Sequence, residues 1–233
     1  MTPSVVEDPR PIDGTLWGAW VRAGNDRWEV VRRSWSVFSR NTTELIDLLN
    51  VPATNIVVSL QLMGDDHDAT NAFWEQLDQR LHNQIASAAT LVDHVRRLLN
   101  YYTADVPALV EEYKQRNAAV TDRDETAYLR DLRNYLLHYG VPPVIQTLSL
   151  GSEGRAGAGH NITLSAERLL EWPRWSAKSR RYLGSFPERD GPILGPDVAT
   201  YADAMREMFV WLFDQRAVIH RESIPDRFRI GQP

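Results

Sequence analysis

The sequence has no cysteine and no long hydrophobic run. The absence of cysteine from its 233 residues excludes disulfides, thiolate chemistry and cysteine-ligated zinc sites. Residues 1–14 lack the apolar centre of a signal peptide, and no apolar run approaches the roughly 20 residues of a membrane-spanning helix. We therefore predict a soluble, cytoplasmic protein.

Lysine is also scarce. Lys114 and Lys178 are the only lysines among 26 basic residues. A GC-rich genome favours arginine codons and is the simplest reason for this bias, although guanidinium groups also bind phosphate well. The net charge of −5 argues against binding of polyanions through bulk electrostatics. It leaves room for one local basic site.

The strongest helical signal covers residues 68–102. Its apolar residues recur at steps of three and four, which places them on one stripe of a helix. They are Phe73, Leu77, Leu81, Ile85, Ala88, Val92, Val95, Leu99 and Tyr102. Residues 86–89 are small, which lets another helix approach closely. Further helices are predicted at 105–117, 125–139 and 197–220.

Residues 144–164 are predicted to form a β-hairpin inserted between helices. Residues 144–150 alternate in polarity, and residues 160–164 form the returning strand. The glycine-rich stretch 151–159 between them is expected to be a long loop. The alternative, a phosphate-cradling loop, lacks the Gly-Lys-Ser/Thr ending of a Walker sequence.

The N-terminal part carries weaker signals. The four tryptophans within residues 16–35 are expected to pack in the core, with base stacking as the alternative. A short helix is predicted at about 42–50, and residues 55–63 fit either a strand or a buried helix. The acidic stretch 64–68, which includes one histidine, is interpreted as a solvated break rather than a metal site.

These signals predict a mainly α protein. We expect an antiparallel helical bundle with a small β-hairpin insertion and an N-terminal helical extension. The predicted units are a flexible arm (1–15), a tryptophan-rich extension packed on the core (16–66), the bundle with its hairpin (67–220) and a C-terminal tail (221–233).

The candidate catalytic residues are Arg133, Asn134 and His138, near the end of the segment 125–139. Five helical steps separate Arg133 from His138 by about 140°. Asp131, Asn134 and His138, in contrast, form one polar stripe. One helix therefore makes an incomplete site. Pairing with a second copy of the helix brings two arginines and two histidines into one cleft.

These residue types suit phosphodiester cleavage. Histidine side chains act as acids and bases near neutral pH, and His138 can accept the proton of a ribose 2′-hydroxyl or protonate the leaving oxygen. Arg133 offers a planar charged fork to the phosphate oxygens, and Asn134 can bond to His138 or to the substrate. The structural alternative pairs Arg133 with Asp93 or Glu125. In that case His138 only caps its helix.

The run Arg133-Asn134-x-x-x-His138 resembles the R-x(4–6)-H signature of the HEPN superfamily, in which Asn, Asp or His commonly follows the arginine. The long preceding helix, with its runs at 82–88 and 91–96, fits the order of a HEPN four-helix core. The resemblance covers roughly residues 68–143 and the final helix.

The resemblance implies a metal-independent endoribonuclease that needs no cofactor. It would act on RNA as a homodimer with a composite Arg/His site and leave 2′,3′-cyclic phosphate and 5′-hydroxyl ends. It also implies a role as a toxin or phage-defence effector, controlled by a cognate antitoxin or another regulatory protein.

Further substrate-binding candidates surround the motif. Asp131 and Tyr139 lie beside it on the same segment. Asp93, His94 and Arg97 lie on the long preceding helix, where they can face the motif helix.

Arg180 and Arg181 belong to the most basic stretch, residues 173–183, in which cations alternate with aromatic residues. Such stretches can hold single-stranded nucleic acid. The alternative is a solvated helix face that tryptophan anchors in the core.

Two other functions fit the same sequence. One is a catalytically inactive HEPN-like helical module that binds a nucleotide or a protein partner. The other is a helical regulator that binds a small molecule in a pocket lined by tryptophans.

Overall fold

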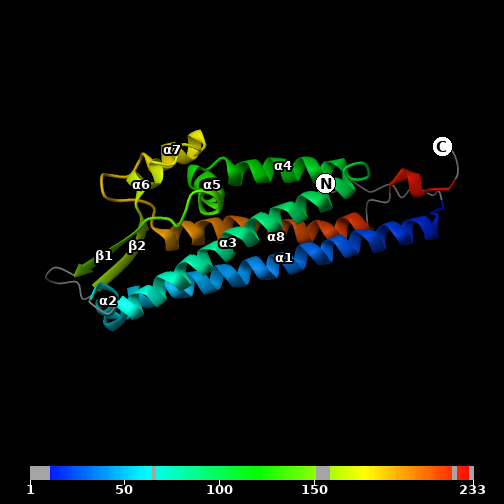
Figure 1. Ribbon diagram of the computed structural model, residues 1–233. Coiled ribbons are helices and arrows are strands. Elements are labelled where there is room, and N and C mark those ends of the chain that lie inside the picture. Colours follow the sequence, from blue (N-terminus) through cyan, green and yellow to red (C-terminus); the bar gives the residue numbers. More distant parts are fainter. Residues whose placement is uncertain (1–10, 65–66, 151–157, 222–224, 231–233) are drawn as a thin grey trace, which may run out of the picture.

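The computed structural model describes residues 11–64, 67–150, 158–221 and 225–230. Within them the protein is mainly helical, with one small two-stranded antiparallel sheet (Figure 1). Three long helices, α1, α3 and α8, lie along one another, and shorter helices cover one side of them. The prediction of a mainly α protein with a β-hairpin is confirmed.

The first helix, α1 (Gly14–Thr54), is longer than predicted. Asp13 caps it, because its carboxylate accepts two hydrogen bonds of 3.0 Å from N–H groups of the first turn. Its buried residues recur at steps of three and four from Trp20 to Leu49, as in a helix that buries one face. The prediction of a separate short helix at 42–50 was wrong, since that segment continues a helix of 41 residues.

A sharp bend at Asn55 separates α1 from α2 (Ile56–Met63). The Asn55 N–H donates to the carbonyl of Val51, and its side chain accepts from N–H groups at the start of α2. Residues 55–63 are therefore helical from Ile56 onward. No single helix in the described part of the chain is long and apolar enough to cross a membrane. The α1–α2 pair meets that test only as two helices bent by 90°.

The helix α3 (His67–Tyr102) runs back along α1, and α8 (Leu194–Arg221) also packs on α1 (Figure 1). Two buried clusters fill the interior, and α1, α3 and α8 contribute to each of them. The largest fully buried side chains are those of Trp28, Tyr102, Tyr128, Phe38 and Phe209. The predicted boundary near residue 66 stays a prediction, but side chains on both of its sides share one interior.

Two further helices, α4 (Pro107–Thr121) and α5 (Asp124–His138), lie over α3 and α8 (Figure 1). The short helices α6 (Ala166–Leu170) and α7 (Ala177–Leu183) follow the hairpin, and α7 packs on α5. The helix that carries the predicted motif, α5, is thus held between α3 on one side and α7 on the other.

The hairpin consists of β1 (Val144–Leu150) and β2 (Ala158–Leu164). Val144 lies opposite Leu164, and the register continues to Leu150 opposite Ala158. The hairpin prediction is confirmed, with a second strand that begins two residues earlier than expected. The middle of the predicted glycine-rich loop, residues 151–157, lies outside the described residues.

The two ends of the described chain lie against each other. Ile12 pairs with Arg229 in an antiparallel bridge. A short 3-10 helix, η1 (Asp226–Phe228), comes just before this bridge. The described residues of the predicted arm and tail therefore pair with each other. Residues 1–10 and 231–233 lie outside the described residues.

A buried polar network joins α1, α3 and α8. The indole N–H of Trp28 donates to the hydroxyl of Tyr102 at 3.0 Å, and that hydroxyl lies 3.0 Å from Nε2 of His220. Burial raises the pKa of Tyr102 to about 12 and lowers the pKa of His220, which keeps both side chains neutral. Gly24 lies directly against this network, because a Cβ added there would overlap the Tyr102 oxygen.

The substitution Gly24→Ala is expected to destabilise the protein by roughly 1–3 kcal/mol, because the added methyl group must displace Tyr102 from its hydrogen bonds. The matched control is Gly18→Ala in the same helix, where the nearest heavy atom would be Nη1 of Arg22 at 3.4 Å. That control is expected to gain up to about 1 kcal/mol from helix propensity. Urea unfolding measures both free energies, and equal stabilisation by the two substitutions would contradict the packing argument.

Candidate functional site

A cleft of about 430 Å³ opens between α3, α4, α5 and α8. Arg133 and Asn134, two of the three predicted catalytic residues, line it from α5. Small and apolar side chains make up much of the remaining wall: Ile85, Ala88, Ala89, Val92, Leu129 and Met205. The volume lies in the range of roughly 300–1,000 Å³ that small-molecule sites occupy.

Arg133 stands between this cleft and a second hollow of about 150 Å³. Ala86 and Ala89 line the second hollow, so both hollows lie over the small-residue section of α3. The Arg133 side chain is exposed, and no described residue makes a hydrogen bond or ion pair with it. The alternative ion pair with Asp93 or Glu125 is therefore not formed within the described residues.

His138 is the last residue of α5 and is exposed. It is not among the described residues that line the 430 Å³ cleft, in keeping with its rotation of about 140° from Arg133. The N–H groups of Tyr139 and Gly140 donate to the carbonyl of Tyr135 at 2.8 and 3.2 Å, so backbone groups close this helix end. The ring of Tyr139, 51% exposed, packs on that of Tyr135. One chain thus presents the arginine and the histidine on different sides.

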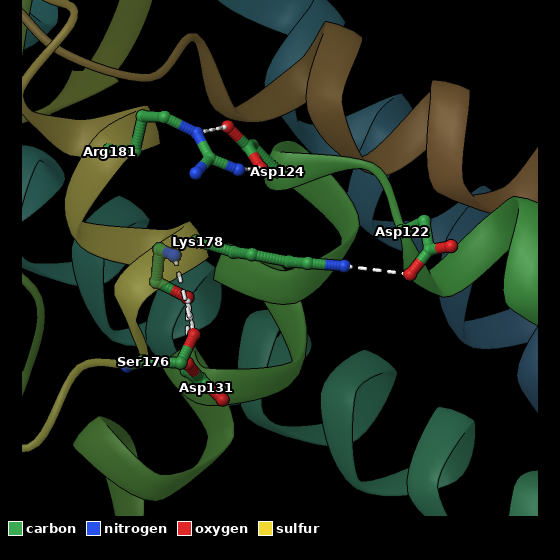
Figure 2. Close-up of polar contacts among 7 residues, drawn as sticks. Asp122, Asp124, Asp131, Ser176, Lys178 and Arg181 are labelled. Carbon is green, nitrogen blue, oxygen red and sulfur yellow. Dashed lines mark hydrogen bonds and ion pairs between the residues drawn. The ribbon is translucent and has the colours of Figure 1, made fainter.

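Asp131 is buried and holds α7 in place. Its carboxylate accepts hydrogen bonds from the N–H of Ser176 at 3.0 Å and from the hydroxyl of Ser179 at 2.7 Å (Figure 2). Ser176 is the N-cap of α7. The side chain of Asp131 also lines the cleft. Its Oδ2 accepts both hydrogen bonds from the N-terminal end of α7.

The predicted basic stretch is partly neutralised by α5 and the turn before it. Lys178 forms an ion pair of 2.8 Å with Asp122, and Arg181 binds both oxygens of Asp124 at 2.5 Å (Figure 2). The hydrogen bonds from Arg181 lower the pKa of Asp124. These cations fasten α7 to the start of α5, so they do not form a free basic face.

The aromatic residues of the same stretch are anchored inside the protein. Trp172 and Trp175 are buried, and the indole N–H of Trp175 donates to the carbonyl of Leu169 at 2.6 Å. The guanidinium of Arg180 bonds to the carbonyls of Pro173 and Trp175. The interpretation as a helix face anchored by tryptophan fits these contacts, and neither tryptophan is free to stack on a base.

The three candidates on α3 point in different directions. Asp93 lines both hollows, and its carboxylate pairs with Arg96 at 2.9 Å. His94 faces α1, where its Nδ1 lies 2.5 Å from the hydroxyl of Ser34. Arg97 is exposed and is not among the described lining residues of the cleft. The expectation that all three face the motif helix was therefore wrong for His94.

The cleft contains polar residues that the sequence did not single out. Arg96 and Arg130 bring further positive charge, and Gln84 and Asn117 add carboxamides to that of Asn134. The two lining carboxylates are both engaged, one by Arg96 and one by α7. The cleft is therefore rich in hydrogen-bond donors although the chain as a whole is acidic. The signal for Gln84 was its place within an otherwise apolar helix stripe.

Tyr182 on α7 and Asp197 on α8 form a titratable pair near the motif helix. The hydroxyl of Tyr182 on α7 lies 2.9 Å from both carboxylate oxygens of Asp197 on α8. Burial, together with the charge of Glu125, raises the pKa of Asp197 to about 6, although the hydrogen bond from Tyr182 opposes this shift. Asp197 therefore changes from neutral to charged near pH 6.

No group of three or more His, Cys, Asp or Glu side chains that could hold a metal ion occurs within the described ranges. Residues 65–66 of the acidic stretch lie outside those ranges. Comparison with protein-family models, curated proteins and solved structures finds no match for this chain. The motif and the cleft are thus the features from which its function can be inferred.

The substitution Asp131→Ala is expected to destabilise the protein by about 1–3 kcal/mol, because the half-buried N–H of Ser176 and the buried hydroxyl of Ser179 lose their acceptor. Asp203→Ala, which removes an exposed carboxylate paired with Arg206 on α8, is the matched control and should cost less than about 1 kcal/mol. Hydrogen exchange should show faster opening of α7 in the first variant alone. Unchanged protection of α7 would mean that Asp131 does not anchor it.

Stability is expected to depend on pH through Asp197. The folded pKa of about 6 lies above the ordinary value of 3.8, so the folded state holds the proton more tightly than the unfolded state. The contribution of Asp197 is therefore greatest below about pH 4 and is lost as the pH rises through 6.

The substitution Asp197→Asn removes this titration. Its free energy of unfolding relative to the unsubstituted protein should rise between pH 4 and pH 7 by up to about 3 kcal/mol. Asp203→Asn, at an exposed position of the same helix, is the control and should show a much smaller change. A difference that stays constant across this pH range would rule out the raised pKa.

Proposed function

We propose that this protein is a metal-independent endoribonuclease of HEPN type that acts as a homodimer. The observation that carries the proposal is Arg133, an exposed guanidinium at a cleft that no described residue pairs with. A cation held at a donor-rich cleft without a counter-ion is suited to bind a phosphate group. Asn134 beside it and His138 one turn later supply the remaining groups of the motif.

The proposed chemistry needs only these side chains. His138 takes the proton from a ribose 2′-hydroxyl. The 2′-oxygen then attacks the adjacent phosphorus, the bond to the 5′-oxygen breaks, and the imidazolium gives its proton to that oxygen, which leaves a 2′,3′-cyclic phosphate and a 5′-hydroxyl. Arg133 stabilises the charge that builds on the non-bridging oxygens, and Asn134 orients the imidazole or the phosphate.

A second copy of the chain completes the proposed site. His138 lies on a different side of α5 from the cleft, so a histidine from the partner copy would have to meet Arg133. Large apolar side chains around the end of α5 support such an interface: Leu137, Tyr139 and Val141 are 46%, 51% and 64% exposed. Exposed apolar side chains of this size are typical of surfaces that bind another protein.

The proposed cellular role is that of a toxin or phage-defence effector in the cytoplasm, controlled by a cognate antitoxin or another regulatory protein. RNA cleavage without a metal or nucleotide cofactor suits such a role, since it requires only release of the site from an inhibitor.

A catalytically inactive HEPN-like module is the second candidate. The observation that favours it is the separation of His138 from the cleft that Arg133 and Asn134 line. In that case the cleft binds a nucleotide or a protein partner without cleaving RNA.

The first experiment incubates the purified protein with RNA in the presence of EDTA. Cleavage should occur without metal, and Arg133→Ala and His138→Ala should each lower its rate by about a hundredfold or more. Arg33→Ala, at an exposed position of α1 paired with Glu29, is the matched control and should keep full activity. Equal behaviour of all variants would leave only the inactive module.

Mixed dimers test whether the site is composite. Arg133→Ala and His138→Ala chains, unfolded and refolded together, form heterodimers in which one of the two sites keeps both residues. Random association should then restore about a quarter of the unsubstituted activity. No recovery, with heterodimers verified by native mass spectrometry, would place both residues of a site on one chain.

A further inference from the structure

The most unusual polar group in the described cleft belongs to Gln84. Its side chain lines the cleft, yet the residue is only 2% exposed. The carboxamide nitrogen Nε2 is buried and has no hydrogen-bond partner. A buried donor without an acceptor costs stability, so the carboxamide nitrogen of Gln84 lowers the stability of the fold.

A ligand in the cleft can satisfy this group. The terminal torsion of a glutamine is soft, so its carboxamide can turn toward the cleft at little cost. Once turned, it presents a donor and an acceptor side by side. Arg133 and Arg130 line the same cleft from α5, and apolar side chains of α3 and α8 make up more of its wall. A ligand that fits has a flat apolar body, a donor–acceptor edge and an anionic group.

We propose that the cleft is a nucleobase pocket in which the Gln84 carboxamide reads the adenine of a ribonucleotide whose phosphate lies at Arg133. Adenine offers the N6 amino group as donor and N7 as acceptor, the pair that a glutamine side chain binds with two hydrogen bonds. Guanine presents two acceptors on the same edge, so the carboxamide oxygen would face an oxygen. The inference rests on the proposed function for the nature of the ligand, and it makes Gln84 a specificity-determining residue.

The cleft also favours the phosphate of such a ligand. Arg96, Arg130 and Arg133 line it with only Asp93 and Asp131 as opposing charges. Asp93 is paired with Arg96 and Asp131 with α7. Arg133 therefore remains available for an anion. The hydroxyl-bearing ring of Tyr201, whose pKa burial raises to about 12, is a further neutral group in the wall.

The test is titration calorimetry of the full chain with adenosine 5′-monophosphate and guanosine 5′-monophosphate in buffer with EDTA. Adenosine monophosphate should bind at least about tenfold more tightly than guanosine monophosphate. Gln84→Leu should remove this preference, and because it also removes the unpartnered amide it should melt about 2–4 °C higher. Gln84→Met provides a second, flexible replacement with the same expected loss of preference.

Two further variants distinguish recognition of the base from binding of the phosphate. Gln79→Leu, at an exposed position of α3, should leave binding unchanged. Arg133→Gln should weaken the binding of both nucleotides by a similar factor and keep the preference for adenine. Failure of adenosine monophosphate to bind at millimolar concentration, or an unchanged preference in both Gln84 variants, would overturn the inference.

The outcome is distinguishable from that of the ribonuclease proposal, because neither nucleotide contains a bond that the enzyme would cut. Adenine-selective binding without RNA cleavage would remove the ribonuclease alone. RNA cleavage that depends on Arg133 and His138 would leave the ribonuclease in place. If the Gln84 variants then kept the nucleotide preference of the unsubstituted protein, the base-reading role alone would be removed.

Discussion

The close approach of α5 to the small-residue section of α3 determines the rest of the candidate site. Ala86 and Ala89 present almost no side chain to α5, so two hollows remain beside the contact and Arg133 stands between them. Larger residues at these positions would fill the hollows and bury or displace the guanidinium.

The polar residues of α5 divide between two tasks. The carboxylate of Asp131 accepts two hydrogen bonds from the N-terminal end of α7. Arg133 and Asn134 line the cleft, and His138 is exposed at the end of the helix. This division explains why a single helix can be both firmly anchored and chemically available. Asp131 also lines the cleft, but the oxygen that anchors α7 already accepts two hydrogen bonds, and Arg133 and Asn134 stay available to a ligand.

Periodicity predicted α3, α8 and the hairpin, but it missed the full length of α1 and the contacts between the elements. The helices at 67–102 and 194–221 carry continuous apolar stripes, and the hairpin has alternating polarity, so local patterns were sufficient for these elements. In α1, polar residues between the tryptophans obscured the same spacing. The roles of Asp131 and Arg181 were not predictable, because each depends on the contact between α5 and α7, and the bonded residues are more than forty positions apart in the sequence. Gln84 was visible as a polar residue in an apolar stripe, but only the packing shows that its amide lacks a partner.

The attachment of α7 to α5 has an inner and an outer layer that respond differently to ionic strength. The inner layer is the buried carboxylate of Asp131 with its two serine donors, which dissolved ions do not reach. The outer layer is the pair of exposed bridges made by Lys178 and Arg181, whose side chains are 37% and 64% exposed and which added salt screens. Concentrated electrolyte would therefore weaken the two exposed ion pairs while the hydrogen bonds to Asp131 stay formed. A polyanion arriving at this edge would compete with Asp122 and Asp124 for the same two cations.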